Sequence, residues 1–298
     1  MSAAMHKAGY VAIVGRPNAG KSTLLNVLVG QKVSITSRKA QTTRRRVVGI
    51  LTRDEVQLVF LDMPGFPARR DTALNRLMNR SVIAGLHDVH AVLLVLDGLR
   101  LDRRELELRE AVPPSMPLVV AINKIDRVRD KTDLLPFIRK ASGQLNCASI
   151  VPVSALKRTG LDELVDVVSG LMPEGPSLYG ADEITQSSER FLAAELIREK
   201  IFRALGDELP YSTAVDITRF ETREDVRRIY AEILVEKEGQ KPIVIGRNGE
   251  KLKAIASRAR EDMEQLFGGK VFLDVWVKVR AGWADDVRAL KRLGYGEP

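Results

Sequence analysis

Short apolar runs alternate with helical patterns over roughly the first 170 residues of the chain. Runs without polar alternation are typical of strands that are covered on both faces in a parallel sheet. The candidate strands are Tyr10–Val14, Leu58–Leu61, Ala91–Leu96, Leu118–Ile122 and Ile150–Val153. Helical patterns such as Lys21–Gly30 and Leu161–Leu171 lie between them, and Val47–Leu51 is predicted to be an antiparallel edge strand. This alternation predicts an open α/β domain, in which ligands bind beyond the carboxyl ends of the strands.

The pattern changes after Met172. The segment 173–188 contains two Pro, two Gly and few apolar residues, so it is predicted to be a linker. A helix over Glu189–Leu205 is expected next, and the later candidates are strands Ser212–Phe220 and Arg227–Glu236, helix Gly249–Phe267 and strand Lys270–Arg280. We therefore predict an α/β domain over residues 1–172, a linker over 173–188 and a smaller α+β domain over 189–298.

Composition narrows the class of protein. Of the 298 residues, 45% are apolar and 29% are charged, as in soluble globular proteins. A single cysteine, Cys147, excludes a disulfide framework and any multi-cysteine zinc site. The longest apolar runs are far shorter than the roughly 18 residues that a membrane span needs, and the first residues have no apolar signal region. We expect a reduced, soluble, cytoplasmic protein.

The formal net charge is +8, and the surplus lies in the first part of the chain. Residues 1–180 carry 26 basic and 17 acidic side chains, whereas residues 181–298 carry 21 and 22. A basic surplus favours a polyanionic partner, although solubility alone would also account for it.

A phosphate-binding loop is predicted directly after the first strand. Residues 15–22, GRPNAGKS, fit the pattern GxxxxGK[ST] and open a helix. Glycines let the backbone wrap around phosphates, whose charge the helix N-terminus stabilises. Lys21 is expected to reach the β- and γ-phosphates, and Ser22 to bind Mg²⁺. The nucleotide-binding residues predicted here are Asn18, Ala19, Gly20, Lys21, Ser22 and Thr23.

Two later loops indicate that the base is guanine. Asn123, Lys124 and Asp126 form an NKxD motif after the strand Leu118–Ile122. The Asp126 carboxylate can accept from guanine N1–H and the exocyclic amine, a donor pair that adenine lacks. The tripeptide that follows the last strand can present a backbone N–H to guanine O6; its residues are Ser154, Ala155 and Leu156.

Two switch elements are predicted around the γ-phosphate. Asp62 follows the strand Leu58–Leu61 and is expected to hold Mg²⁺ through water, while the Gly65 N–H senses the γ-phosphate. Thr43 is predicted to supply the second hydroxyl ligand to the metal, with the adjacent Thr42 as the alternative. Ser22, Thr43 and Asp62 are thus the candidate metal ligands, and Lys21, Thr43 and Gly65 the candidate catalytic residues.

The second domain contains a GxxG loop ahead of a helix. In KH domains such a loop clamps the backbone of about four nucleotides. The candidate RNA-binding residues are Gly246, Arg247, Asn248, Gly249, Lys251 and Lys253. The pattern alone is weak, because an ordinary glycine turn also matches it. Its context favours RNA, since Lys237–Arg260 holds seven basic and two acidic residues.

Together these motifs resemble the translation-factor-related class of P-loop GTPases, and the whole chain resembles the Era family of ribosome-assembly GTPases. The residues that carry the likeness are Gly15–Thr23, Gln41–Arg44, Asp62–Gly65, Leu74–Arg76, the NKID and Ser-Ala-Leu loops and the C-terminal region. The resemblance implies a P-loop GTPase domain followed by a type II KH domain, with GTP, GDP and Mg²⁺ as ligands. It also implies slow GTP hydrolysis, binding of 16S ribosomal RNA near its 3′ end on the 30S subunit, a monomeric state and peripheral contact with the inner face of the cell membrane.

Some positions leave alternatives open. Phe66 stands where many GTPases have a water-orienting Gln, and Asn18 matches the position that holds K⁺ in potassium-dependent relatives, so K⁺ activation is a hypothesis. The run Arg44–Arg46 is interpreted as a solvated basic strand start or an RNA contact rather than an arginine finger. Trp276 is expected in the core, while Trp283 is left undecided.

Two other functions compete with an RNA-binding switch. A tRNA-modifying GTPase would carry similar motifs in its G domain, but the C-terminal residues RLGYGEP lack the cysteine expected of such an enzyme. The second domain could also be a protein- or membrane-docking module, in which case its basic face would contact anionic lipid.

Overall fold

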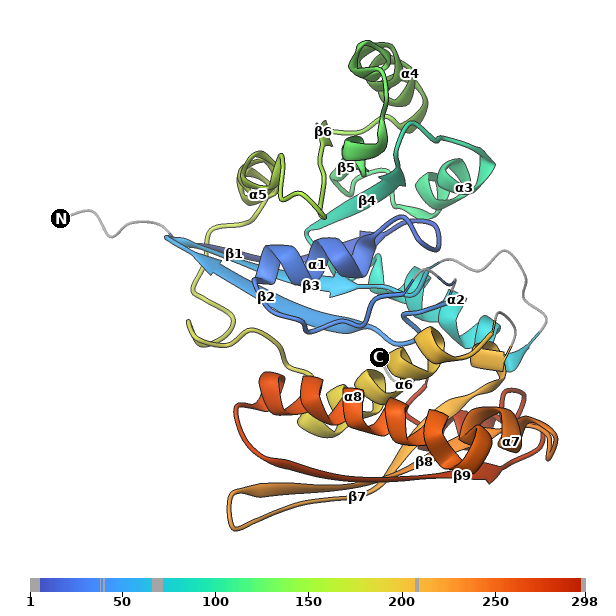
Figure 1. The fold of residues 1–298 in the computed structure, drawn as a ribbon. Helices are drawn as coiled ribbons and strands as arrows, with labels where there is room; N and C mark the ends of the chain where they lie inside the picture. Colours follow the sequence, from blue (N-terminus) through green and yellow to red (C-terminus); the bar gives the residue numbers. More distant parts are fainter. Residues whose placement is uncertain (1–5, 38, 40, 66–71, 207–208, 296–298) are drawn as a thin grey trace.

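The computed structural model describes residues 6–37, 39, 41–65, 72–206 and 209–295. Figure 1 shows two layered domains, the first above the second, with helix α6 of the second domain next to the first. Among the described residues, no helix has an apolar stretch long enough to cross a membrane.

The first domain is built on a six-stranded sheet with the order β2-β3-β1-β4-β5-β6. Its strands are β1 (Lys7–Val14), β2 (Val47–Arg53), β3 (Val56–Asp62), β4 (Ala91–Asp97), β5 (Leu118–Asn123) and β6 (Ser149–Pro152). Strand β2 lies at the edge and pairs antiparallel with β3, and the other pairs are parallel. Both the parallel sheet and its antiparallel edge strand are as the apolar pattern predicted.

Helices cover both faces of this sheet. They are α1 (Lys21–Val29), α2 (Ala73–Gly85), α3 (Arg103–Ala111), α4 (Leu134–Leu145) and α5 (Leu161–Gly170), with 3-10 turns at Ile125–Arg127 and Lys131–Asp133. Successive residues of β4 enter opposite cores: Leu93 packs in the core with α1 and α5, and Leu94 in the core with α2, α3 and α4. Since side chains alternate across a strand, a strand buried on both faces is apolar throughout.

The segment between α5 and α6 lies along the first domain. The Ile50 N–H on β2 donates to the Ile184 carbonyl, and the Thr185 hydroxyl donates to the Val48 carbonyl. The polar composition of this segment is consistent with its position on the surface. Its hydrogen bonds with β2 cover part of the free edge of that strand.

The second domain has one helical face and one open face. Its elements are α6 (Glu189–Ala204), β7 (Ala214–Arg223), β8 (Val226–Val235), α7 (Gln240–Ile245), α8 (Glu250–Phe267), β9 (Val271–Val279) and α9 (Val287–Arg292), with 3-10 turns at Leu209–Ser212 and Arg247–Gly249. The sheet order is β7-β8-β9, with the first pair antiparallel and the second parallel. Helices α6 and α8 pack on the sheet in one core. This is the helix–strand–strand–helix–helix–strand order of a type II KH domain.

The structure corrects the prediction for Trp276 and settles the environment of Trp283. Trp276 is not a core residue: it is 37% exposed, because it lies on the open face of β9, where its Nε1 donates to the Glu232 carboxylate. Trp283 is fully buried, and its Nε1 donates to the Ser212 carbonyl at 3.1 Å. Cys147 is only partly buried and packs at the margin of the core that contains α4.

Candidate functional site

The phosphate-binding loop connects β1 to α1, where the GxxxxGKS pattern placed it. Gly20 has a φ of 100°, and a Cβ there would stand 2.3 Å from Nδ2 of Asn123. Asn18 is also left-handed, with a φ of 65°. These conformations suit glycine and asparagine, and they turn the loop into the N-terminus of α1.

Lys21 is buried in this loop, and its Nζ donates to the carbonyls of Gly15 and Arg16, each at 3.1 Å. Burial lowers the pKa of Lys21 to about 8, against an opposing effect from the Asp62 carboxylate. The ammonium is therefore partly desolvated before any nucleotide arrives, which makes an anionic partner more stabilising.

Three hydroxyls converge on the Asp62 carboxylate. Its Oδ2 accepts from Ser22 at 2.6 Å, from Ser34 at 2.9 Å and from Thr43 at 3.4 Å. Burial raises the pKa of Asp62, while Lys21 and these hydroxyls oppose that change. The Oδ1 atom is buried and has no partner among the described residues. The carboxylate of Asp62 and the hydroxyls of Ser22 and Thr43 are hard oxygen donors of the kind that Mg²⁺ prefers, so these residues fit this ion.

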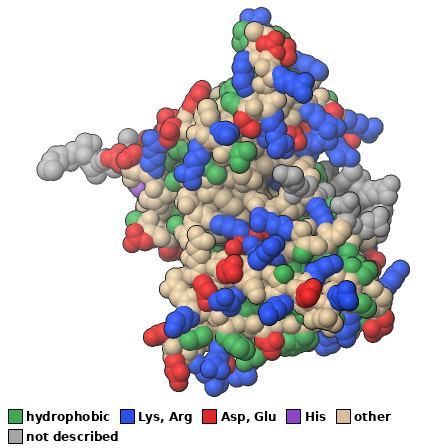
Figure 2. Space-filling view, in the orientation of Figure 1, with side chains coloured by type: hydrophobic (Ala, Val, Ile, Leu, Met, Phe, Trp, Pro, Cys, Tyr) green, Lys and Arg blue, Asp and Glu red, His purple; other side chains and the backbone are tan. Residues whose placement is uncertain are grey.

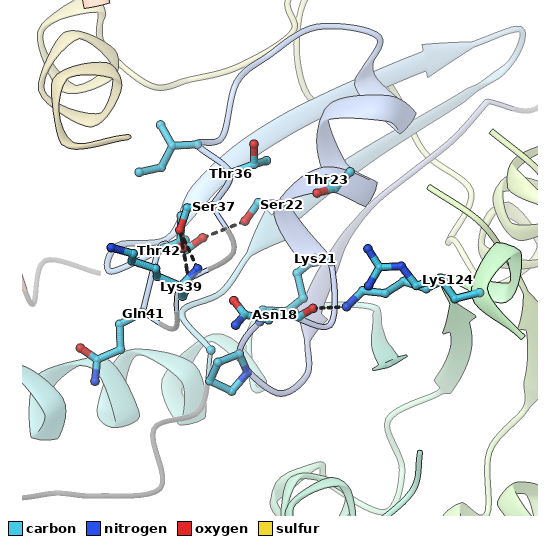
Figure 3. A pocket seen from close by; sticks show the side chains of 16 residues that line it. Asn18, Lys21, Ser22, Thr23, Thr36, Ser37, Lys39, Gln41, Thr42 and Lys124 are labelled. Carbon is cyan, nitrogen blue, oxygen red and sulfur yellow. Dashed lines mark hydrogen bonds between the residues drawn. The ribbon is translucent and has the colours of Figure 1, made fainter. Parts of the chain in front are cut away.

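The structure separates the two adjacent threonines. The Thr43 and Ser22 hydroxyls lie 2.8 Å apart. The dashed line that starts at Ser22 in Figure 3 marks this hydrogen bond. Thr42 points elsewhere: its hydroxyl bonds to Ser37 and donates to the Lys39 carbonyl, both at 2.7 Å. The geometry therefore favours Thr43 as the metal ligand.

Ser22 and Thr43 lie in the wall of a cavity of about 510 Å³ (Figure 3). Its lining comes from the phosphate loop and α1, the loop between α1 and β2, Gly65 and the loop after β5. These residues are Pro17, Asn18, Gly20, Lys21, Ser22, Thr23, Ile35, Thr36, Ser37, Lys39, Gln41, Thr42, Thr43, Gly65, Lys124 and Arg127. Phe66, the position expected to lack a water-orienting side chain, lies outside the described residues.

The residues of the predicted base-reading loops meet at one end of the sheet. Asn123 is buried; its side chain donates to the Ala19 carbonyl and accepts from the Ala155 N–H, so it braces the two loops. Lys124 Nζ lies 2.6 Å from the Asn18 carbonyl and pairs with Asp97 at 2.8 Å. Asp126 is exposed beside them.

The exposed Asp126 carboxylate is held in its charged form. A 2.5 Å hydrogen bond from the Ser154 hydroxyl lowers the pKa of Asp126. Leu156 is 69% exposed, and because its side chain has no hydrogen-bond donor, only its backbone N–H could contact guanine O6. A charged acceptor at this place is what guanine N1–H and its amine require.

The loop that lines the cavity is also bound to the second domain. Arg44, next to Thr43, is buried, and it donates to the carbonyls of Thr213 at 2.8 Å, Tyr211 at 3.0 Å and Pro210 at 3.1 Å. Its guanidinium lies 5.7 Å from the Phe202 ring centroid. The interpretation of Arg44 as a solvated or RNA-contacting residue is therefore wrong, because its partners belong to the other domain.

Helix α6 holds the same loop at other points. Arg198 donates to the Thr42 carbonyl, and the buried Glu199 accepts from the Thr36 N–H at 3.0 Å. Lys32, just after α1, bridges Glu199 and Asp262 at 2.6 Å each. The loop thus contacts the nucleotide cavity on one side and the second domain on the other.

The GxxG loop is accessible at the N-terminus of α8. Gly246 has a φ of 75°, and a Cβ there would meet Lys251 at 2.6 Å, so glycine is required. Asn248 is left-handed at φ 51°, a conformation that asparagine tolerates, which explains why it can replace the usual glycine. Arg247 and Lys253 are exposed, and Lys251 and Gly249 are partly so. On the face seen in Figure 2, basic and acidic side chains are mixed on the second domain.

Some residues at the site were not predicted. Asp97 is the last residue of β4, as Asp62 is the last residue of β3, so the rule that ligands bind at the carboxyl ends of parallel strands could have found it. Ser34, Arg44 and Glu199 have no such signal, because their partners are distant in sequence.

A proton-uptake prediction follows from the lowered pKa of Lys21. At pH 8.5 much of this lysine is neutral, and nucleotide phosphates beside it raise its pKa. We therefore expect GDP binding at pH 8.5 to take up protons, and GDP affinity to fall as the pH rises above 8. Calorimetry in buffers of different ionisation enthalpy measures the uptake, with Lys21→Met as the variant that abolishes it. Equal heats in all buffers would contradict the prediction.

Comparison with known proteins identifies both domains. Residues 10–124 match the family described as 50S ribosome-binding GTPase, and residues 208–284 match the KH domain family. The chain is 54% identical to the GTPase Era of Nitrosomonas eutropha over 295 residues, covering 99% of this chain and 100% of the relative. It is 52% identical to the GTPase Era of Chromobacterium violaceum, covering 96% of this chain and 97% of that relative.

Two solved structures have the same fold throughout. One is an Aquifex aeolicus Era variant bound to GDP·AlF4⁻, and the other is Era in complex with MgGDPNP and nucleotides 1506–1542 of 16S ribosomal RNA. Each has a TM-score of 0.93 and 39% identity, and covers 98% of this chain and 100% of its own. With its GTP-hydrolysing domain and its KH domain in this order, the chain belongs to the Era family of GTPases.

Proposed function

We propose that this GTPase is a switch that binds 16S ribosomal RNA near its 3′ end during maturation of the 30S subunit and is released after hydrolysis. The observation that carries the proposal is that the connection between α1 and β2 touches both sites: Thr36 and Thr43 line the nucleotide cavity, while Lys32 and Arg44 are bonded to the KH domain. The related Era bound to this RNA segment supports the choice of partner.

The geometry of the cavity explains how GTP would be held. Backbone N–H groups of the phosphate loop and the Lys21 ammonium receive the phosphates, while Asp126 receives the guanine edge. Ser22, Thr43 and Asp62 would hold Mg²⁺, which neutralises charge on the phosphates. The Gly65 backbone stands at the cavity wall, where its N–H can donate to the γ-phosphate.

Hydrolysis would change the coupling between the domains. When the γ-phosphate leaves, the contacts that order Gly65 and Thr43 are lost. Thr43 is bonded to Arg44 through the backbone, and Arg44 is fixed to the turn Leu209–Ser212 and to Thr213. A displacement of Thr43 therefore moves the attachment point of the KH domain. Because no side chain of the described residues is an evident general base, we expect slow intrinsic turnover.

The test is RNA binding by the purified protein at fixed salt, since salt alone changes such affinities greatly. The small-subunit 3′ segment is compared with a scrambled oligonucleotide, each with GTP analogue, GDP and no nucleotide. Sequence-specific binding that depends on the nucleotide supports the proposal. Binding that is indifferent to sequence would reject it and favour a docking function for the second domain.

The RNA site makes its own prediction. Arg247→Asp reverses the charge of an exposed side chain in the GxxG loop, so RNA affinity is expected to fall about tenfold or more while GTP affinity stays unchanged. Arg139→Asp, on the exposed surface of α4, is the matched charge reversal and should have little effect. Filter binding measures both, and an unchanged RNA affinity in Arg247→Asp would contradict the assignment of this loop.

K⁺ activation is a further part of the proposal. Asn18 lines the cavity at the position that holds K⁺ in potassium-dependent relatives. We expect single-turnover hydrolysis to be faster in K⁺ than in Na⁺ at equal ionic strength, and the Asn18→Ala variant to lose the difference. Equal rates of the unmodified protein in the two salts would rule it out.

The cellular setting is proposed on general grounds. We infer a monomeric cytoplasmic protein whose basic surplus allows weak contact with anionic lipid at the inner face of the membrane. Co-sedimentation with phosphatidylserine vesicles at low and high salt tests the contact, since an electrostatic attraction is lost at high salt.

A further inference from the structure

A second cavity of about 360 Å³ lies between the two domains. Its walls come from the start of β2 and the arginines before it, from α2, from the beginning of α6 and from the C-terminal region. The lining residues are Arg44, Arg45, Arg46, Val48, Leu74, Leu77, Met78, Ser81, Gln186, Ser187, Ser188, Phe191, Gly294 and Tyr295. The phosphate loop does not contribute to it, so it is separate from the nucleotide cavity.

The described walls of this cavity carry three arginines, Arg44, Arg45 and Arg46. Arg45 and Arg46 form no hydrogen bond or ion pair with the rest of the described chain. Arg44 is 2% exposed, and its Nε has no acceptor among the described residues. None of the described residues that line the cavity is acidic. Arg44 is held by three carbonyl groups and Arg45 lies on the Phe191 ring, but no carboxylate in the described walls balances the charge of these side chains. An anion in the same space would supply that balance.

Neutral donors lie beside the arginines. Ser188 caps the 16-residue helix α6, and Ser187 precedes it, so the positive end of that helix opens at the cavity. Ser81 lines the cavity from α2, on the first domain. Hydroxyls and a helix N-terminus next to guanidinium groups form a set that recognises phosphate oxygens.

The remaining wall is apolar. Leu74, Leu77 and Met78 come from α2, and Phe191 comes from α6, where the Arg45 guanidinium lies 4.5 Å from its ring centroid. A volume of about 360 Å³ is within the range of small-molecule sites. This apolar wall can contact a nonpolar group of a ligand, and inorganic phosphate has no such group.

We propose that this cavity binds a small phosphate ester that carries an aromatic or apolar group. The phosphate lies at Arg45, Arg46 and the N-terminus of α6, and the nonpolar group lies against α2 and Phe191. Because the walls belong to both domains, an occupied cavity holds them in the arrangement seen here.

The experiment uses the full chain saturated with Mg²⁺ and GDP, so that the first cavity is filled. The chain has two tryptophans, and the Trp276→Phe variant leaves only Trp283, which is stacked on the cavity residue Tyr295 at 6.5 Å. Trp283 emission and binding heat are followed during titration with AMP, with adenosine and with inorganic phosphate. We expect saturable binding of AMP, weaker binding of phosphate and little binding of adenosine.

Matched variants locate the site. Arg46→Gln is expected to weaken AMP binding about tenfold, because it removes one charge-assisted contact. Arg53→Gln, at the other end of β2 and paired with Asp162, should leave AMP binding unchanged. The proposal is overturned if neither emission nor heat shows saturable AMP binding, if adenosine binds as well as AMP, or if both variants lose affinity equally. It is also overturned if a single-stranded RNA oligonucleotide occupies the cavity and AMP does not.

Discussion

Replacing Arg44 with methionine is expected to separate GTP binding from RNA binding. Methionine keeps an apolar stem beside Phe202 but cannot donate to Pro210, Tyr211 or Thr213. GTP affinity should stay within about threefold, because Arg44 does not line the nucleotide cavity. The difference in RNA affinity between the GTP-analogue and GDP states should disappear.

The same substitution is expected to weaken the domain interface by about 3 kcal/mol, because buried carbonyl groups lose a charged donor. Local unfolding is the appropriate measure, since two-domain chains need not unfold in one step. Hydrogen exchange at Leu209–Ser212 and Thr213 should accelerate, while exchange in β4 and β5 stays slow.

The control is Arg46→Met, two residues further along the same segment. Arg46 makes no hydrogen bond or ion pair with the described residues, so its loss should leave the nucleotide dependence of RNA binding intact. If Arg44→Met retained that dependence, Arg44 would be a packing residue only, and coupling would have to run through Lys32 and Glu199.

The first domain could be predicted from sequence because its information is local. Continuous apolar runs indicate buried parallel strands, and each motif stands directly after such a run. Once the strands are placed, their carboxyl ends bring Lys21, Asp62 and Asn123 together. Asp97 follows the same rule and could have been predicted with them.

The domain interface could not be predicted in this way. Arg44 is one of three consecutive arginines, and nothing in the sequence distinguishes the buried one from Arg45 and Arg46. Its acceptors are backbone carbonyls, which every residue has, and they lie more than 160 positions away. The sequence leaves the neighbouring Trp283 undecided for the same reason, since its burial depends on that contact.

In the second domain, the sequence patterns do not predict helix α7 or the exposure of Trp276. Helix α7 is only six residues long and contains Pro242 and three β-branched residues, a composition that favours a strand or a turn. The position of Trp276 in a strand predicts that it lies in the core. However, one face of the sheet packs on α6 and α8 and the other is open, so half of an apolar strand remains accessible.

The second large effect is expected on GTP hydrolysis, when one of the two adjacent threonines is replaced. Thr43→Val keeps the shape of the side chain and removes the hydroxyl that lies 2.8 Å from Ser22. Thr43 is the structure's candidate for the second metal ligand, so single-turnover GTP hydrolysis is expected to fall about 100-fold or more. GDP affinity should change little, because the contact to the metal that Thr43 makes depends on the γ-phosphate.

Thr42→Val is the matched control, since it removes a hydroxyl one residue away that bonds only to Ser37 and the Lys39 carbonyl among the described residues. Its hydrolysis rate should stay within about threefold of the unmodified protein. The Thr42 carbonyl that accepts from Arg198 is backbone and survives the change. A large loss in Thr42→Val with little loss in Thr43→Val would reverse the assignment. It would mean that the loop reorders around GTP, so that Thr42 replaces Thr43 beside Ser22 and Arg44 must leave the KH domain.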